Sequence, residues 1–125
     1  MAPLAIVVDD DFSVRESLES LIRSAGLEVR TFASAEEFLN SAHSRKADCL
    51  ILDVCLQGMS GIDLHRQMLA RGCRVPAIFI TAHGYDGQTR SQTNSAWTVV
   101  CLTKPFSEEE LFDAIQTALK WQPSN

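Results

Sequence analysis

The stretch LAIVVDDD, residues 4–11, decides the fold of this chain of 125 residues. Its five apolar residues fit a central strand covered by helices on both faces, because such a strand turns no face to water. Two further runs, residues 49–52 and 77–80, are equally apolar and also end at a polar residue, Asp53 and Thr81. The sequence therefore predicts a buried parallel sheet whose strands end at polar side chains.

Stretches of helical period separate the apolar runs. An apolar stripe begins at Val14 and closes at Gly26, a residue that favours the left-handed end of a helix. The segments SAEE, residues 34–37, and SEEE, residues 107–110, have the spacing of a capping box and mark two more helix starts. The pattern predicts strands at residues 4–8, 28–32, 49–52, 77–80 and 99–102, a first helix closed by Gly26, and helices at about 34–41, 61–71 and 107–119.

Alternating strands and helices indicate an α/β fold with a doubly wound, five-stranded parallel sheet, for which the flavodoxin-like strand order 2-1-3-4-5 is a common solution. Residues 88–95, within the polar stretch from Tyr85 to Ser95, have no apolar stripe, so a fourth helix there is expected to be weak or irregular. No repeat or linker interrupts the chain, and we expect a single domain over residues 1–125.

Composition excludes several classes of protein. The net charge is −5, with no long basic run, which argues against direct binding to nucleic acid. No apolar run approaches the roughly 18 residues of a membrane span, and no signal peptide is evident, so we expect a cytoplasmic protein. Four cysteines without the close pairing of a zinc site are expected to be thiols in the core or in loops: Cys49, Cys55, Cys73 and Cys101.

Polar residues that end four strands carry the predicted chemistry. Ligands of such sheets bind outside the carboxyl ends of the strands, where these side chains meet. Three carboxylates at 4 Å repel one another by roughly 4 kcal/mol per pair at an effective dielectric of about 20, and Mg²⁺ offsets this repulsion. A lysine and a threonine hydroxyl suit phosphoryl oxygens. The residues are Asp9, Asp10, Asp53, Thr81 and Lys104.

Four short segments resemble the signature segments of response-regulator receiver domains. They are VVDDD at residues 7–11, Asp53 with MSG at residues 59–61, ITA at residues 80–82 and KPF at residues 104–106. The resemblance covers nearly the whole chain. SAEEFL, residues 34–39, is similar to receivers that head helix-turn-helix transcription factors of the nitrogen-fixation and nitrate-response type.

The resemblance implies a role for each matching residue. Asp53 would be the phosphoacceptor, and Asp9 and Asp10 the acidic pair that holds Mg²⁺. The metal shell would also include Asp53 itself and the backbone carbonyl of Cys55. The resemblance further implies a switch hydroxyl on Thr81, a phosphate-contacting Lys104 and a cis peptide bond before Pro105.

The chain departs from the family pattern at several positions. Cys55 and His83 would flank the phosphoryl group, and His83 is read either as a catalytic base or as a solvated loop histidine. Gln57 stands where the family usually has a proline. Cys101 stands where family members commonly carry an aromatic residue, which puts the usual coupling between the threonine and that aromatic in doubt. Trp97 is read either as a substitute aromatic or as a packing residue.

Two functions follow from these observations. The first is a receiver domain phosphorylated on Asp53 by a histidine kinase or a phosphotransfer protein, which signals by a conformational switch and catalyses only its own phosphorylation and dephosphorylation. The alternative is a phosphorylation-independent interaction module of the same fold. A metal-dependent phosphatase is disfavoured because Cys55 stands where that class has a second acid. The sequence leaves open a homodimer and a C-terminal DNA-binding domain outside this chain.

Overall fold

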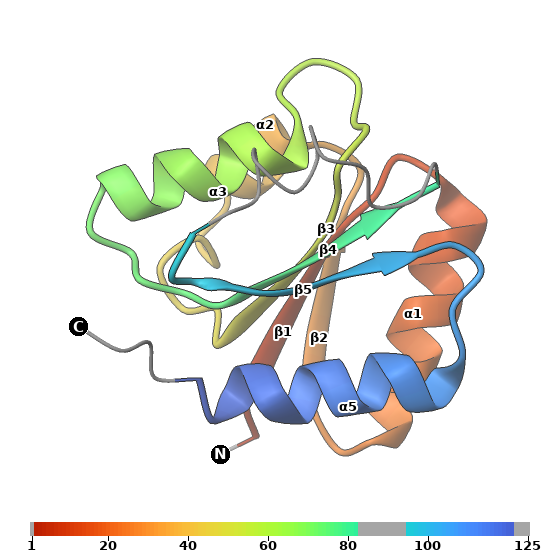
Figure 1. Cartoon of the computed structure of the whole chain (residues 1–125). Helices are drawn as coiled ribbons and strands as arrows, with labels where there is room; N and C mark the ends of the chain where they lie inside the picture. Colours follow the sequence, from red (N-terminus) through yellow and green to blue (C-terminus); the bar gives the residue numbers. More distant parts are fainter. Residues whose placement is uncertain (1, 83–94, 122–125) are drawn as a thin grey trace.

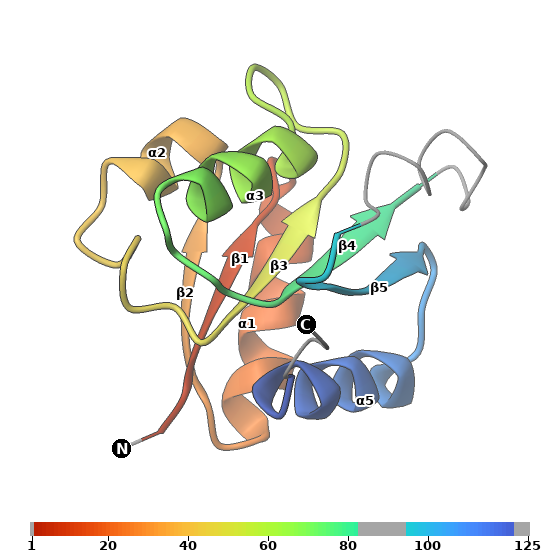
Figure 2. The same ribbon diagram turned by 60° about the vertical axis from the view of Figure 1, so that its left-hand side comes forward.

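The computed structural model describes residues 2–82 and 95–121, and in them five strands form one parallel sheet. The strand order is β2-β1-β3-β4-β5, as predicted, and Figure 2 shows the strands side by side with their arrowheads at one edge. The strands are β1 (Leu4–Val8), β2 (Glu28–Phe32), β3 (Cys49–Asp53), β4 (Ala77–Thr81) and β5 (Thr98–Thr103). The helices are α1 (Phe12–Ser24), α2 (Ala35–Leu39), α3 (Gly61–Ala70) and α5 (Glu108–Leu119).

Helices cover both faces of the sheet, as Figure 1 shows, with α2 and α3 on one face and α1 and α5 on the other. Side chains alternate between the two faces along a strand, so each central strand contributes side chains to two hydrophobic cores, one on each face of the sheet. Ile6 and Val8 of β1 lie in the core under α2 and α3, while Ala5 and Val7 lie in the core under α1 and α5. This explains why the predicted central strands are apolar at every position.

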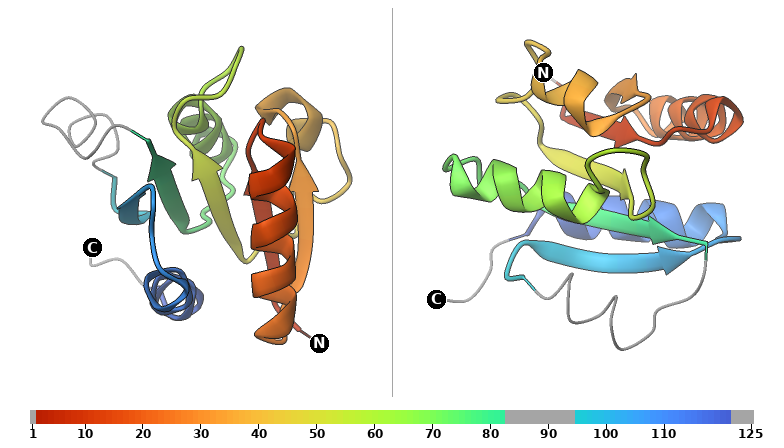
Figure 3. Two further views of the ribbon diagram at one scale, coloured as in Figure 1. Left: turned by 90° about the vertical axis from the view of Figure 1, so that its right-hand side faces the viewer. Right: turned by 90° about the horizontal axis from the view of Figure 1, so that it is seen from above.

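Two helices divide the second face between them. Helix α1 packs on β1 and β2, and α5 packs on β3, β4 and β5, an arrangement visible in Figure 3. Each helix runs back from the carboxyl edge of the sheet to its amino edge, so the described loops after β1, β2, β3 and β5 gather at one edge. In Figure 1 these loops lie at the upper right of the molecule.

Polar side chains fix the helix starts. Asp11 caps α1 by accepting hydrogen bonds from the backbone N–H groups of Ser13 at 2.9 Å and Val14 at 3.4 Å. In α5 the predicted capping box is present in both directions between Ser107 and Glu110. Such caps stabilise a helix by about 1 kcal/mol, because they satisfy N–H groups that have no partner within the helix.

Helix α2 differs from its prediction, since it ends at Leu39 rather than near Ser41. The Ser41 hydroxyl donates to the carbonyl oxygen of Phe38 at 2.7 Å, which satisfies a carbonyl that one more helical turn would use. At its start, Ser34 accepts from the N–H of Glu37 at 3.1 Å.

The predicted irregular fourth helix and His83 lie outside the described residues. Trp97 is described, and its carbonyl oxygen accepts from the N–H of Ala77 at 2.9 Å, at the amino end of β4. Thr81 lies at the other end of that strand, roughly 13 Å away at the usual rise of a strand. Trp97 is therefore not a substitute aromatic beside Thr81. Among the described residues, none of the helices has the length and apolar character that crossing a membrane requires.

Candidate functional site

Three carboxylates meet at the carboxyl edge of the sheet. Asp9 and Asp10 follow β1, and Asp53 is the last residue of β3, the neighbouring strand. One carboxylate oxygen of each lies within 4.8 Å of the others. Asp9 and Asp53 are buried, with 1% and 7% of their surface exposed, whereas Asp10 is exposed. The cluster is therefore open to solvent on the side of Asp10.

Lys104 brings a positive charge to this cluster from the end of β5. Its ammonium nitrogen lies 3.5 Å from Oδ2 of Asp9 and 3.7 Å from Oδ2 of Asp53. The backbone places it there, because the N–H of Lys104 donates to the carbonyl oxygen of Thr81 at 2.9 Å. The bond between Lys104 and Pro105 is cis, the isomer that the resemblance implied.

Thr81 ends β4 at the same edge and is 3% exposed. Strand register explains its position, since Asp53 of β3 pairs with Ile80 of β4 and Thr81 follows directly. The N–H of Val54 continues the ladder by donating to the carbonyl oxygen of Ile80 at 2.9 Å. Parallel pairing therefore places the predicted threonine and the predicted phosphoacceptor on adjacent strands at one end of the sheet.

The environment of Asp53 disfavours its charged form. Burial raises the pKa of the Asp53 carboxyl above its usual value, and the negative charges of Asp9 and Asp10 raise it further. Two contacts act in the opposite direction on the pKa, the Lys104 charge and the N–H of Cys55, which donates to Oδ1 of Asp53 at 2.9 Å. The effects of burial and of like charge on the pKa exceed the two opposing effects, so the cluster favours the binding of a further positive charge.

Local hydrogen bonds hold Asp9 in place. Its Oδ1 accepts from the N–H of Asp11 at 2.8 Å, and its carbonyl oxygen accepts from the Arg15 guanidinium at 2.7 Å. The same guanidinium lies 5.6 Å from the centre of the Phe12 ring. The turn between β1 and α1 is thus braced by the first residues of the helix, which fixes the direction of the Asp9 side chain.

Gly61 allows α3 to start directly against β3. A Cβ atom at this position would lie 2.3 Å from the carbonyl oxygen of Asp53 and 3.2 Å from Cβ of Leu52. Real Cβ atoms do not approach backbone so closely. The glycine in the MSG segment therefore has a steric role, since any larger residue would push the helix away from the strand end that carries Asp53.

The donor set fits a hard divalent cation. Carboxylate and carbonyl oxygens are the ligands that Mg²⁺ prefers, and Mg²⁺ retains several water ligands and binds phosphate oxygens. Asp9, Asp10 and Asp53 provide carboxylates within a few ångströms, and Asp10 faces solvent. Burial, and after it the nearby negative charges, raise the pKa of Asp53, and Lys104 offsets the negative charges only in part, so a divalent cation would compensate charge at this site.

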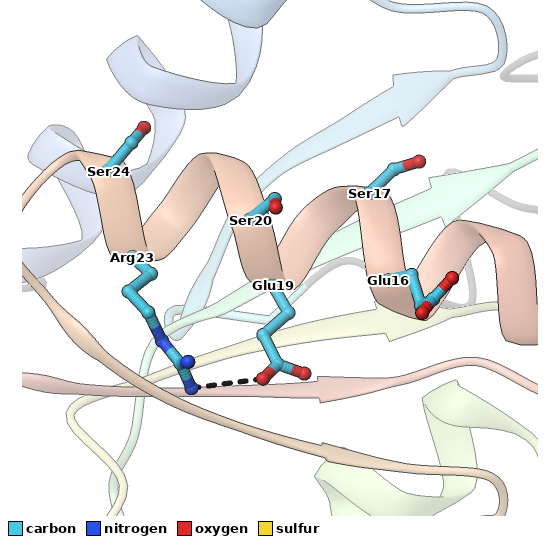
Figure 4. Close-up of a pocket in the computed structure, with 6 residues that line it drawn as sticks. All are labelled: Glu16, Ser17, Glu19, Ser20, Arg23 and Ser24. Carbon is cyan, nitrogen blue, oxygen red and sulfur yellow. Dashed lines mark hydrogen bonds and ion pairs between the residues drawn. The ribbon is translucent and has the colours of Figure 1, made fainter.

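A second candidate surface is the outward face of α1, shown in Figure 4, where a hollow has a volume of about 640 Å³. Among the six described residues that line it, the charged contact is an exposed ion pair of 2.9 Å between Arg23 and Glu19, one helical turn apart. Such pairs contribute only about 0.3–0.5 kcal/mol. The remaining residues are Glu16, Ser17, Ser20 and Ser24, a solvated helix face. The acidic cluster is the stronger candidate.

Comparison with known proteins assigns the family. The sequence model described as "Response regulator receiver domain" matches residues 5–116. The chain belongs to the response regulator receiver domain family. The receiver domain is 46% identical to response regulator protein TodT of Pseudomonas putida over 122 residues, which cover 98% of this chain and 53% of TodT.

Two further relatives agree with this assignment. Transcriptional regulatory protein FixJ of Azorhizobium caulinodans is 34% identical over 113 residues, which cover 90% of this chain and 53% of FixJ. The solved structure of response regulator StyR is 42% identical, with a TM-score of 0.83, and covers 96% of the receiver domain and 60% of that chain. The chain spans about half the length of the curated relatives it matches.

The predicted departures from the family pattern fall at different places in the receiver domain. Cys55 is exposed beside Asp53, and its N–H rather than its thiol contacts the carboxylate. Cys101 is half-buried and packs against the core under α2 and α3, where burial raises the pKa of its thiol to about 11. It is therefore a packing residue whose thiol keeps its proton at neutral pH.

Sequence reasoning missed two polar residues of α2 and α3. Glu36 appeared only as part of a capping-box pattern, yet its Oε2 accepts from the N–H of Met59 at 3.2 Å. His65 is 2% exposed, and its Nε2 lies 2.9 Å from the carbonyl oxygen of Val75. The signal for His65 is its place on the apolar face of α3, one residue after Leu64 and three before Met68.

Proposed function

We propose that this receiver domain accepts a phosphoryl group on Asp53 in a Mg²⁺-dependent reaction, with a histidine kinase or a phosphotransfer protein as the donor. The observation that carries the proposal is the meeting of three carboxylates within 4.8 Å, with Lys104 at 3.5 and 3.7 Å from two of them. One lysine does not neutralise three carboxylates, so the acids are suited to bind a cation. The lysine itself is suited to contact a phosphoryl group that the cation also binds.

Four residues would hold the ion, namely the carboxylates of Asp9, Asp10 and Asp53 and the backbone carbonyl of Cys55. When bound, Mg²⁺ would neutralise charge on the phosphoryl oxygens. The exposed position of Asp10 suits direct binding of a hydrated ion. Both Asp9 oxygens already have neighbours, the N–H of Asp11 and the Lys104 ammonium, which suits a contact through water.

Asp53, Lys104 and Thr81 would each have a separate role in the phosphoryl transfer. Oδ1 of Asp53 accepts the N–H of Cys55, and Oδ2 lies 3.7 Å from the Lys104 ammonium, so Oδ2 would be the oxygen that attacks phosphorus next to the lysine. The new bond joins Asp53 Oδ2 to phosphorus, and the bond from phosphorus to the donor histidine nitrogen breaks. Lys104 would hold one phosphoryl oxygen by its charge, and the Thr81 hydroxyl would donate a hydrogen bond to another.

The product would be an acyl phosphate that water later hydrolyses. The domain would thus act on its own aspartate and on no separate substrate, as a signalling module in the cytoplasm. Its surface would change when Thr81 follows the phosphoryl group. The curated relatives are about twice as long as this chain. We further propose that a DNA-binding domain outside this chain receives the signal and that the domain forms a homodimer.

One observation favours a second candidate, a receiver-fold interaction module that works without phosphorylation. Cys101 on β5 pairs with Phe79 of the neighbouring β4. The position of Cys101 therefore carries a small thiol and no aromatic side chain that could move together with Thr81. The acidic cluster favours the first candidate, because an interaction module has no need of three acids around one lysine.

Phosphotransfer from purified histidine kinases tests the proposed donor. A cognate kinase is expected to label the wild-type domain within seconds to minutes and to leave Asp53→Asn unlabelled, and chelation of Mg²⁺ is expected to stop the transfer. If phosphoryl groups moved equally well to wild type and to Asp53→Asn, the acceptor assignment would be wrong.

A further inference from the structure

The loop from Val54 to Ser60 connects β3 to α3 and carries Cys55. Its first residues are tied to the sheet, since the N–H of Val54 donates to Ile80 and the N–H of Cys55 donates to Asp53. Its last residue, Ser60, caps α3 by accepting from the N–H of Asp63 at 3.0 Å. Between these ends, Leu56 is buried in the core under α2 and α3, and Met59 packs against the same core.

A hydrogen bond from α2 adds a further contact near the end of this loop. Oε2 of Glu36 accepts the N–H of Met59 at 3.2 Å, across 23 residues of sequence. Gly58, the residue before Met59, has a φ of +77°, and an added Cβ would lie 2.9 Å from that same Oε2 atom. The left-handed glycine therefore turns the chain so that the next N–H faces α2, and its missing side chain leaves room for the carboxylate.

The role of Glu36 is separate from helix capping. The N-cap contact of α2 is made by Ser34 with the N–H of Glu37, and Glu36 takes no part in it. A carboxylate that accepts a backbone N–H forms a charge-assisted hydrogen bond, which is stronger than a neutral one. Within residues 2–82 and 95–121, this is the hydrogen bond that joins α2 to the loop.

We propose that Glu36 is a positioning residue for the metal and phosphoryl site. By holding Met59, it restricts the movement of the loop that carries the carbonyl of Cys55. This inference rests on the proposed function, because it assigns the loop a ligand for Mg²⁺. If the contact is lost, a smaller fraction of molecules has the carbonyl in place, and the apparent affinity falls in proportion to that fraction.

Two substitutions at Glu36 and a matched control test the proposal. Glu36→Ala removes the acceptor, Glu36→Gln keeps an acceptor without the charge, and Glu37→Ala removes the same charge from the neighbouring exposed residue of α2. The measurements are Mg²⁺ affinity from amide NMR shifts and the hydrogen-exchange rate of the Met59 amide. A third measurement is the rate of labelling by acetyl phosphate as a function of Mg²⁺ concentration.

We expect Glu36→Ala to weaken Mg²⁺ binding by about three- to tenfold, the effect of one hydrogen bond. The Met59 amide should exchange faster in the same variant. Its labelling rate should return to the wild-type value at saturating Mg²⁺, because the nucleophile itself is intact. Glu36→Gln should restore most of the affinity, and Glu37→Ala should bind Mg²⁺ like the wild type.

Three results would overturn the inference. Faster exchange at Met59 with unchanged Mg²⁺ affinity in Glu36→Ala would show a contact that only stabilises the loop. Equal weakening in Glu37→Ala would show a general charge effect, and no recovery in Glu36→Gln would exclude the hydrogen bond as the cause. A wild-type domain that binds no Mg²⁺ and accepts no phosphoryl group would instead overturn the proposed function, and the inference with it.

Discussion

Asp9 and Asp10 are neighbours in the chain, yet their surroundings differ in burial and in contacts. Asp9 is buried, and both of its oxygens have neighbours within the protein, the N–H of Asp11 at 2.8 Å and the Lys104 ammonium at 3.5 Å. Asp10 is exposed and belongs to the same cluster of three acids. At the scale of single residues, Asp10 is thus the carboxylate best placed to bind an incoming ion directly.

The first prediction ranks these two acids. Asp10→Asn should weaken Mg²⁺ binding more than Asp9→Asn, because in the proposed site the exposed Asp10 would bind the ion directly and Asp9 would bind it through water. NMR or tryptophan-fluorescence titration with Mg²⁺ measures both variants against the wild type. The opposite order would refute the assignment of the two roles.

His65 is a buried titratable residue outside the acidic cluster. Its ring lies edge-on to Phe79, and its Nε2 donates to the carbonyl oxygen of Val75 in the neutral form that carries the proton on this nitrogen. Burial lowers the pKa of His65 below its usual 6.5, and the hydrogen bond to Val75 only partly opposes this change. The folded protein therefore keeps this imidazole neutral at a pH where the unfolded chain binds a proton.

The second prediction follows from that difference. Just below pH 6.5, His65 binds its proton more readily in the unfolded chain than in the folded protein, so the contribution of His65 to the free energy of unfolding should fall as the pH falls from about 6.5. Above that pH, the His65 contribution is fully present. Urea denaturation of the wild type and of His65→Gln at several pH values isolates the effect, with His43→Gln as the control. An identical pH dependence in the wild type and in His65→Gln would contradict it.

At the scale of elements, the start of α3 and the end of β3 are in direct contact. Gly61 is the first residue of α3, and the carbonyl oxygen of Asp53 occupies the space that a side chain would need. The carbonyl oxygen belongs to the backbone of β3, and an added Cβ would be fixed to the backbone of α3. A small shift of one side chain therefore does not relieve the clash. The position of α3 and the position of Asp53 are therefore coupled.

The third prediction concerns Gly61→Ala. The added methyl group should destabilise the domain by about 1–3 kcal/mol, as overpacking does, and should move the amide NMR signals of Asp53 and its neighbours. Gly72→Ala is the control, because Gly72 lies beyond the other end of α3 with open space around it, although its φ of +83° also disfavours alanine. The Asp53 signals should stay unchanged in Gly72→Ala. If they also stayed unchanged in Gly61→Ala, the coupling between α3 and Asp53 would be disproved.

At the scale of the whole molecule, the sequence carries the topology and most of the site. Strands that are apolar throughout, such as residues 4–8, predict a sheet covered on both faces, and the structure confirms their positions and order. The polar residues at their ends meet because parallel strands end at one edge. The expected meeting of Asp9, Asp10 and Asp53 thus follows from topology alone.

Other contacts depend on distances between distant segments, which a local pattern does not contain. Glu36 reads as a capping residue from its spacing, and only the fold brings α2 beside Met59. The same holds for Gly61, whose contact with Asp53 requires α3 to pack on β3. His65 could have been placed in the core from the apolar face of α3, but its partner Val75 could not, because it lies on the loop before β4.

Phosphorylation of Asp53 is the central claim, and intact-protein mass spectrometry tests it most directly. The domain is incubated with acetyl phosphate, with Mg²⁺ or with a chelator, and the same is done with Asp53→Asn. We predict one added phosphoryl group on the wild type in the presence of Mg²⁺, none with the chelator and none on Asp53→Asn. No added group on the wild type, or equal addition to both proteins, would contradict the account.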